Sequence, residues 1–380
     1  MSFESLALHP LLVDQLLKQG FTKPYDIQQR AIPEILKNND LLGIAATGSG
    51  KTASYVLPLL SRFKQAKQSK DRKVNVLVLV PTRELAVQVN EVFQLFSSAL
   101  PHAVKTMAVF GGVSINPQMK ALYGVNILVA TPGRLLELKE SNAVELGSIE
   151  TLVLDEADKM LNLGFKDEMD RIFKLLPQKR QNLLFSATLN ENIDGLQKVL
   201  LNHPTVINIA PTHDTPDLIN QMAYAVSDER KGPLLRYLIK TEELNQVLVF
   251  VSSIQRADNV ANKLRANGID AWPIHSKKSQ GARTDLITKF KYGKLRVLVA
   301  TDLLARGIDI EFLPCVVNYE LPRSPKDYIH RIGRTGRAEN PGKAISLITP
   351  DEQHHFGVIQ KKIGKSIDVV ESKDFDLKGF

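Results

Sequence analysis

The chain has 380 residues, of which 43% are hydrophobic, and this composition is sufficient to fill two globular cores. No apolar run approaches the roughly 20 residues of a membrane-spanning helix, and the single cysteine, Cys315, excludes an intrachain disulfide and a cysteine-cluster metal site. The formal net charge of +8 favours a polyanionic partner, and without a signal-like N-terminal stretch we expect a soluble protein of the reducing cytoplasm.

Short β-branched runs alternate with helix-like stretches along the chain. Their continuous apolar character is typical of strands in parallel sheets that are covered by helices on both faces. The predicted fold class is therefore α/β, with mostly parallel sheets flanked by helices. The predicted strands lie at residues 41–45, 76–80, 127–130, 151–154, 183–185, 247–251, 297–300 and 344–348.

Three landmarks, an apolar run, a YG pair and an LVAT run, indicate that one α/β unit is present twice. The run VLVLV at 76–80 returns as VLVFV at 247–251, and YG followed by LVAT at 123–131 also returns about 170 residues further along. A stretch with two prolines and little apolar content, 210–220, predicts a linker between domains at 1–209 and 221–380. The charged end, 371–380, is expected to be frayed.

The first predicted strand leads into AATGSGKT, residues 45–52, and then into a helical pattern. This order is that of a Walker A phosphate loop, although Ala45 stands where the first glycine is usual. The glycines let backbone N–H groups surround phosphate oxygens, Lys51 would reach the β- and γ-phosphates, and the Thr52 hydroxyl would coordinate Mg²⁺. The predicted ATP-binding residues of the loop are Ala46, Thr47, Gly48, Ser49, Gly50, Lys51 and Thr52.

A phosphate loop of this kind needs a carboxylate for magnesium at the end of a neighbouring buried strand. The segment TLVLDEAD, residues 151–158, provides it. Asp155 would bind Mg²⁺ together with Thr52, and Glu156 would orient and deprotonate the attacking water. Asp155, Glu156 and Lys51 are thus predicted catalytic residues.

Six motifs taken together resemble those of the DEAD-box RNA helicases. They are AATGSGKT, PTRELA at 81–86, TPGR at 131–134, DEAD at 155–158, SAT at 186–188 and HRIGRTGR at 330–337, and they follow the family order. The resemblance runs from Phe3 to about residue 348. It implies two tandem RecA-like domains that close on each other around ATP and single-stranded RNA.

The resemblance assigns further residues to the nucleotide. GFTKPYDIQ, residues 20–28, is similar to the family's Q motif, in which Gln28 would read the adenine edge and Phe3 would pack on the base. In the second domain, Arg334 and Arg337 would reach the γ-phosphate as arginine fingers, and Asp309 would meet the ribose.

The same resemblance assigns contacts with the RNA backbone. These contacts position a strand without reading its sequence. The predicted RNA-binding residues are Pro81, Thr82, Arg83, Gly112, Thr131, Pro132, Gly133 and Arg134 in the first domain, and Arg283, Thr301 and Asp302 in the second. Ser186, Thr188 and His330 would couple the ATP site to the RNA groove. One position departs from the family, because Ser276 stands where a glycine is usual, and Trp272 is expected in the core.

The function that these features predict is ATP-dependent unwinding or remodelling of RNA, with ATP and Mg²⁺ as cofactors and RNA as partner. Two alternatives stay open: an ATP-gated RNA clamp that seldom turns over, and a DNA translocase with related motor motifs. Backbone contacts cannot name the RNA target. The compact core resembles that of small bacterial helicases used in ribosome assembly, RNA decay or cold adaptation, and we expect a monomer in the cytoplasm.

Overall fold

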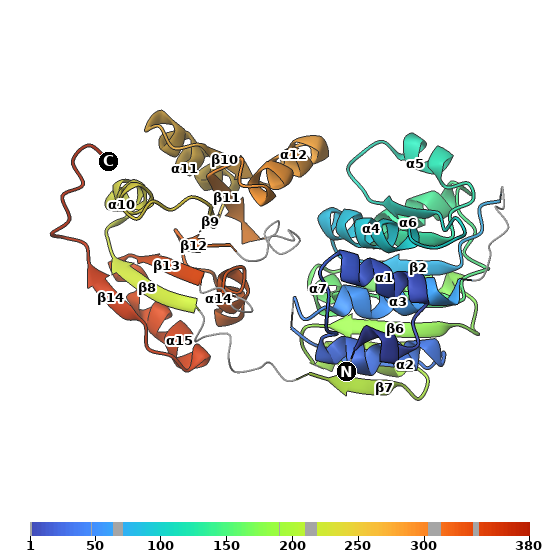
Figure 1. The fold of residues 1–380 in the computed structure, drawn as a ribbon. Coiled ribbons are helices and arrows are strands. Elements are labelled where there is room, and N and C mark those ends of the chain that lie inside the picture. Colours follow the sequence, from blue (N-terminus) through green and yellow to red (C-terminus); the bar gives the residue numbers. More distant parts are fainter. Residues whose placement is uncertain are drawn as a thin grey trace. The chain divides into compact units, whose positions relative to one another are not determined.

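The structure, a computed structural model, describes residues 2–46, 48–63, 71–189, 191–209, 219–302, 313–336 and 342–380. The chain divides into two compact units, Met1–Pro211 and Thr212–Phe380, each with a seven-stranded sheet (Figure 1). Every strand pairing in both sheets is parallel. The predicted α/β class is confirmed. Among the described residues, no helix is both long and apolar enough to cross a bilayer.

The strands of the first unit follow the order β3-β4-β2-β5-β6-β1-β7. They are β1 (Leu41–Ile44), β2 (Val76–Leu79), β3 (Thr106–Val109), β4 (Ile127–Ala130), β5 (Thr151–Leu154), β6 (Gln181–Ser186) and β7 (Thr205–Asn208). The helices are η1 (Phe3–Leu6), α1 (Pro10–Lys18), α2 (Asp26–Leu36), α3 (Lys51–Arg62), α4 (Arg83–Ser97), α5 (Ile115–Ala121), α6 (Pro132–Glu140), α7 (Ala157–Asn162), α8 (Lys166–Leu175) and α9 (Glu191–Leu200).

The strands of the second unit follow the order β10-β11-β9-β12-β13-β8-β14. They are β8 (Ile219–Ala225), β9 (Val247–Val251), β10 (Ala271–Ile274), β11 (Val297–Thr301), β12 (Cys315–Asn318), β13 (Gly342–Ile348) and β14 (Asp368–Glu371). The helices include α10 (Asp228–Thr241), α11 (Ile254–Ala266), α12 (Gln280–Lys291), α14 (Pro325–Ile332), η2 (Pro350–Glu352) and α15 (Gln353–Ile363). Each strand of this sheet takes the place that the strand numbered seven lower takes in the first sheet, so the two units share one topology. The repeated landmarks predicted this duplication.

Alternation along the central strands explains why their sequences are continuously apolar. Val76 and Val78 of β2 pack in one core cluster of the first unit, and Leu77 and Leu79 pack in the other. Each face of the strand therefore contributes to a separate core, as expected for a parallel sheet covered on both sides.

Short polar side chains begin several of the helices that follow strands. Thr82 accepts a hydrogen bond from Leu85 N–H at the start of α4, and Ser253, Ser279 and Ser324 do the same for α11, α12 and α14. These caps satisfy backbone donors that have no partner within the helix. They place each helix start directly after the carboxyl end of a strand or the turn that follows it.

Two expectations about the second unit were wrong. The stretch after β14 is docked and not frayed, because Phe375 packs against Tyr224 and Tyr237, and Arg230 donates hydrogen bonds to the carbonyls of Ser372 and Phe375. The expectation of a frayed end relied on the charged residues of this stretch and gave no weight to Phe375, which makes the packing contacts.

Trp272 is not in the core, since it lies on the edge strand β10 with 43% of its surface exposed. The predicted linker, 210–220, lies outside the described residues except for Ile219 and Asn220, which begin β8.

Candidate active site

Three motifs of the first unit, the phosphate loop, the acidic turn and the segment 186–188, lie at the carboxyl ends of three neighbouring strands. The phosphate loop follows β1, the acidic pair Asp155 and Glu156 follows β5, and the segment 186–188 closes β6. These strands are adjacent in the order β5-β6-β1. The carboxyl edge of a parallel sheet is where α/β proteins bind ligands.

The phosphate loop turns sharply into α3. Gly48 and Gly50 have φ values of 79° and 87°, in the left-handed region that favours glycine. The Lys51 ammonium donates hydrogen bonds to the carbonyls of Ala45 and Ala46, at 2.5 and 3.0 Å. Burial lowers the pKa of Lys51, and the nearby Asp155 and Glu156 carboxylates oppose that shift. The ammonium thus lies inside the loop, among the oxygens of its own backbone.

Asp155 is held in one orientation by two donors. The Tyr55 hydroxyl donates to Oδ2 at 2.8 Å, and the Glu156 N–H donates to Oδ1 at 2.9 Å. Burial raises the pKa of Asp155 to about 6, helped by the Glu156 carboxylate and opposed by Lys51 and Tyr55. Only 2% of Asp155 is exposed. The carboxylate is therefore positioned at an electrostatic cost to the folded state.

Both predicted metal ligands meet at Tyr55. Burial raises the pKa of the Tyr55 phenol well above its ordinary value, Asp155 adds to the rise, and a hydrogen bond with the Thr52 side chain opposes it. A hydroxyl and a carboxylate are oxygen ligands of the kind that Mg²⁺ takes, together with phosphate and water. The residues present fit this ion.

Glu156 has one engaged and one unengaged carboxylate oxygen. Its Oε1 pairs with the Lys159 ammonium at 2.5 Å, and both side chains are largely buried. Its Oε2 is buried and has no hydrogen-bond partner among the described residues. The backbone of Glu156 is left-handed, with φ 53°, where the chain turns from β5 into α7. A buried acceptor without a donor suits a base that receives a proton from water.

Asp158 joins the acidic turn to the end of β6. Its Oδ2 accepts a hydrogen bond from the Thr188 hydroxyl at 3.2 Å, and Ser186 Oγ donates to the Thr188 carbonyl at 2.8 Å. Of the predicted coupling residues, Thr188 thus contacts the acidic segment directly, and Ser186 is bonded to Thr188. Sequence reasoning missed Asp158, Tyr55 and Lys159; only Asp158 carried a signal, as the last residue of DEAD.

The Q-motif residues are close to the phosphate loop. Gln28 accepts a hydrogen bond from Tyr25 N–H at 2.9 Å and donates one to the Gly50 carbonyl at 3.2 Å. Its amide therefore ties α2 to the loop. Phe3 lies in the core of the first unit with 3% exposed, so little of its ring is available to a base. Thr47 lies outside the described residues.

The predicted RNA contacts of the first unit follow the carboxyl ends of β2, β3 and β4. They are Pro81, Thr82 and Arg83 at the start of α4, Gly112 in the loop after β3, and Thr131, Pro132, Gly133 and Arg134 at the start of α6. The Arg83 guanidinium lies so close over Gly112 that a Cβ there would clash with it. Arg134 departs from the expected direct contact, because it is buried and bonds the Val113 carbonyl and the Glu137 carboxylate, both at 2.8 Å.

In the second unit, Arg331 organises the predicted motifs. It forms a bidentate ion pair with Asp302, at 2.6 and 2.8 Å, and donates to Asn318 Oδ1 and the Glu320 carbonyl. Asp302, expected on RNA, is therefore the partner of a buried arginine. Sequence reasoning missed Arg331, although it stands within HRIGRTGR.

The remaining predicted residues of the second unit lie on α12, β11 and α14 or beyond the described ranges. Arg283 is buried at the start of α12 and donates to Gln280 Oε1 at 2.7 Å, and Thr301 ends β11. Arg334 is 5% exposed after α14, and His330 is half-buried on that helix. Asp309 and Arg337 lie outside the described residues.

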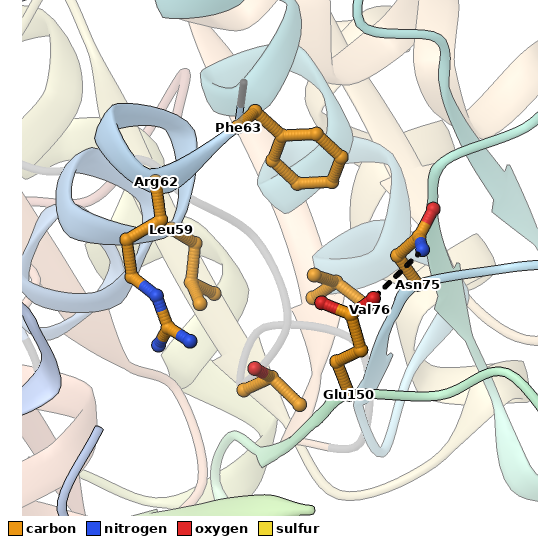
Figure 2. A pocket seen from close by; sticks show the side chains of 7 residues that line it. Leu59, Arg62, Phe63, Asn75, Val76 and Glu150 are labelled. Atoms are coloured by element: carbon orange, nitrogen blue, oxygen red, sulfur yellow. Dashed lines mark hydrogen bonds between the residues drawn. The ribbon is translucent and has the colours of Figure 1, made fainter. Parts of the chain in front are cut away.

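A pocket of about 330 Å³ in the first unit lies away from these motifs. Val76 and Thr151, the first residues of β2 and β5, line it together with Arg62, Phe63 and Glu150 (Figure 2). Figure 2 shows the hydrogen bond between Asn75 and Glu150 at its rim. The pocket is at the amino ends of the strands, whereas the acidic and phosphate motifs are at their carboxyl ends.

Comparison with known proteins identifies relatives over nearly the whole chain. The DEAD/DEAH box helicase family model matches residues 25–196, and the helicase conserved C-terminal domain model matches residues 230–339. The chain is 37% identical over 375 residues to the ATP-dependent RNA helicase CshA of Listeria monocytogenes, an alignment that covers 98% of this chain and 71% of that protein. It is also 37% identical over 368 residues to the ATP-dependent rRNA helicase RRP3 of Debaryomyces hansenii, with coverage of 96% and 76%.

A solved structure matches the fold of nearly the whole chain. Dbp5 of S. cerevisiae, bound to RNA and ADP BeF3, matches with a TM-score of 0.86 and 31% identity, over 98% of this chain and 96% of that chain.

Proposed function

The chain belongs to the DEAD-box ATP-dependent RNA helicases, and from this premise we propose how its residues bind ATP, hydrolyse it and hold RNA. The resemblance that the motifs carried is confirmed, and so are the predicted enzyme class and the use of ATP and RNA. A DNA translocase finds no support among these relatives. The roles of individual residues and the role in the cell are our own proposals.

Thr52 and Asp155 are the residues that would hold the Mg²⁺ of magnesium-ATP. Their convergence at the Tyr55 hydroxyl supports this assignment. Mg²⁺ bound there would neutralise charge on the β- and γ-phosphates. Tyr55 and the Glu156 N–H orient Asp155 before any ligand binds, so that little reorientation is needed.

Lys51 would bind the phosphates. Its ammonium is buried against the carbonyls of Ala45 and Ala46, and a phosphate oxygen offers a charged acceptor in place of these neutral ones. The backbone N–H groups of the loop and the start of α3 would complete the cradle.

Glu156 is the general base that the geometry supports best. The observation that carries the proposal is the state of its two carboxylate oxygens. One carboxylate oxygen is fixed by Lys159, while the other is buried without a donor. A water bound at Oε2 would satisfy that oxygen and lose its proton to it as it attacks the γ-phosphate. Lys159 would keep the carboxylate aimed in one direction.

We base the proposed hold on RNA on the residues predicted to contact its backbone in each unit. Arg83, Thr131 and the loop around Gly112 would grip phosphates in the first unit, with Arg134 supporting that loop. In the second unit, Asp302 would act through its ion pair with Arg331. The protein would work as a cytoplasmic monomer. A role in ribosome assembly is supported by the relatives named rRNA helicases, and RNA decay is the other pathway we consider.

Arg334→Ala tests whether the ATPase site is shared between the units. We expect ATP affinity to change little while RNA-stimulated turnover falls by about 10³ or more, as for other arginine fingers. Arg323→Ala is the matched control, because Arg323 is an exposed arginine just before α14. Near-normal turnover in Arg334→Ala would rule out this shared site.

The first unit alone provides a second test. Residues 1–209 should bind nucleotide but show no RNA-stimulated hydrolysis. For the full-length chain, the same steady-state ATPase assay with and without RNA decides between an RNA-stimulated helicase and a clamp that seldom turns over.

A further inference from the structure

The second unit exposes an aromatic side chain that none of the motifs explains. Trp272 lies on β10, which pairs with β11 and stands at one end of the strand order among the described residues. Its indole N–H donates to Asp270 Oδ1 at 3.1 Å, and the Arg265 guanidinium lies 4.7 Å from the ring centroid. Arg265 is itself bonded to the Ala271 carbonyl. An exposed indole held by these contacts loses little freedom when a ligand stacks on it.

A pocket adjoins this indole. It has a volume of about 390 Å³, within the range of ligand sites, and is bounded by Trp272 and by side chains of α12 and the loop that follows. Leu286 and Leu295 supply apolar walls, and both belong to the core cluster under α12. Arg265 does not line the pocket, so the pocket meets a part of the indole that Arg265 leaves uncovered.

The rim of the pocket is positively charged. Lys278, Lys289 and Lys294 line it, against two carboxylates, Asp270 and Asp285. Asp270 is engaged by the Trp272 N–H, and Asp285 pairs with Lys289 at 2.7 Å. Within the part of the chain that the structure describes, Lys278 and Lys294 have no ion-pair partner. The pocket therefore offers an aromatic surface flanked by two unpaired cations.

Its place in the chain connects the pocket with the proposed RNA grip. Lys278 belongs to the turn between β10 and α12, and that turn leads to Arg283, a predicted RNA contact. Ser276, where the family usually has glycine, stands in the same turn. From Lys278 the pocket extends along α12 to Lys294 and Leu295, which precede β11, so a polyanion held at the turn would have to continue along this edge of the sheet to reach the Trp272 ring.

We propose that Trp272 stacks on a base of the bound RNA while Lys278 and Lys294 contact the phosphates next to it. A polyanion with flat aromatic units is the ligand whose chemistry matches this combination, since bases stack on aromatic side chains irrespective of sequence. The contact lies outside the ATPase site and adds base stacking to a grip that otherwise holds the backbone. It rests on the proposed function, because it extends the same RNA path.

The chain's single tryptophan makes the test direct. Intrinsic fluorescence of the full-length protein is followed during titration with single-stranded oligoadenylate, while anisotropy of labelled RNA reports saturation. We expect the emission of Trp272 to be quenched with the same midpoint as RNA binding. A strand of equal length built from abasic ribose phosphates should bind without this quenching. Unchanged fluorescence at saturating oligoadenylate, or equal quenching by the abasic strand, would overturn the proposal.

Variants measure the contribution to affinity. Trp272→Ala should weaken oligoadenylate binding about tenfold and abasic-strand binding hardly at all, whereas Trp272→Phe should retain most of the affinity. Lys294→Ala should reduce the slope of affinity against salt by about one. The matched control is Tyr292→Ala, because Tyr292 is 72% exposed at the end of α12 and does not line the pocket. Equal losses in Tyr292→Ala and Trp272→Ala would contradict a specific stacking site.

The outcomes separate this proposal from the proposed function. RNA-stimulated ATPase activity should persist in Trp272→Ala at saturating RNA. If the wild type shows that activity but Trp272 does not respond to RNA, the stacking site is refuted and the pocket is left to a protein partner. If the wild type shows no RNA-stimulated activity at all, the proposed function fails first. Urea unfolding followed by circular dichroism checks that each variant is folded.

Discussion

Replacing Asp155 by asparagine should stabilise the ligand-free protein while abolishing its ATPase activity. A carboxyl group whose pKa is raised in the folded state binds its proton more tightly there than in the unfolded chain. Folding is then favoured when the group is protonated, and stability is lost as pH rises through the window between the two pKa values. For Asp155 the pKa rises from 3.8 to about 6.

The magnitude follows from that rise. One pKa unit corresponds to about 1.4 kcal/mol, so ionised Asp155 costs the folded state about 3 kcal/mol above pH 6. This figure already includes the opposing effects of Lys51 and the Tyr55 hydrogen bond. Asparagine resembles the neutral carboxyl group in shape. We therefore expect a gain of about 3 kcal/mol near pH 7.5, and a difference close to zero near pH 4.

The assay is urea unfolding of the full-length chain in EDTA without nucleotide, at both pH values, followed by circular dichroism. Trp272 fluorescence follows only the second unit, whose transition should not shift. Asp14→Asn, an exposed aspartate on α1, is the matched control and should change stability by a few tenths of a kcal/mol. Magnesium-ATP should then stabilise the wild type more than Asp155→Asn, because the variant lacks the charged metal ligand.

Two results would refute this reasoning. A lower stability of Asp155→Asn at neutral pH would show that the charged carboxylate is well compensated in the fold. A difference that does not change with pH would mean that packing, and not ionisation, sets the effect of the substitution.

The other predictions concern ATP binding and hydrolysis, RNA binding, and the stability of the second unit. Lys51→Ala should weaken nucleotide binding in calorimetric titrations, whereas Glu156→Gln should retain ATP and stop its hydrolysis; turnover equal to the wild type would remove Glu156 as the base. RNA affinity measured by anisotropy should fall steeply with added salt and vary little between unrelated single strands, and a strong preference for one sequence would contradict backbone binding. Phe375→Ala should lower the stability of the second unit by about 1–3 kcal/mol, followed through Trp272 fluorescence, and an unchanged midpoint would show that the docked end contributes nothing.

The strands that could be predicted are those buried on both faces. Apolar runs at 76–80 and 247–251 correspond to β2 and β9, because central strands of a parallel sheet need apolar residues at every position. Six strands were missed: β3, β7, β8, β10, β12 and β14. Five of them carry exposed or half-buried residues, which break the apolar run. The sixth, β12, is buried at every position but is only four residues long and ends in Asn318. Their pairing comes from neighbours far away in the chain, which no local pattern contains.

The sequence predicted where the functional motifs lie, in loops after strands, but not which side chains they contact. Spacing placed the phosphate loop and the acidic turn after strands, where the structure has them. It could not reveal that Tyr55 would hold Asp155 from 100 residues away, or that Arg331 would engage Asp302. These partnerships depend on the order of strands in the sheet. Nor could spacing reveal that Arg134, expected to face RNA, is buried and bonds the Val113 carbonyl and Glu137.

The edge strand β10 has a further consequence for the protein at high concentration. An open strand edge next to an exposed indole is the kind of surface on which a second chain can add a strand and begin to aggregate. Pro273 follows Trp272 directly and offers no N–H to an incoming strand. An intruding β-ladder would therefore be interrupted beside the exposed ring. We expect that Pro273→Val would leave the fold intact but make concentrated solutions prone to self-association.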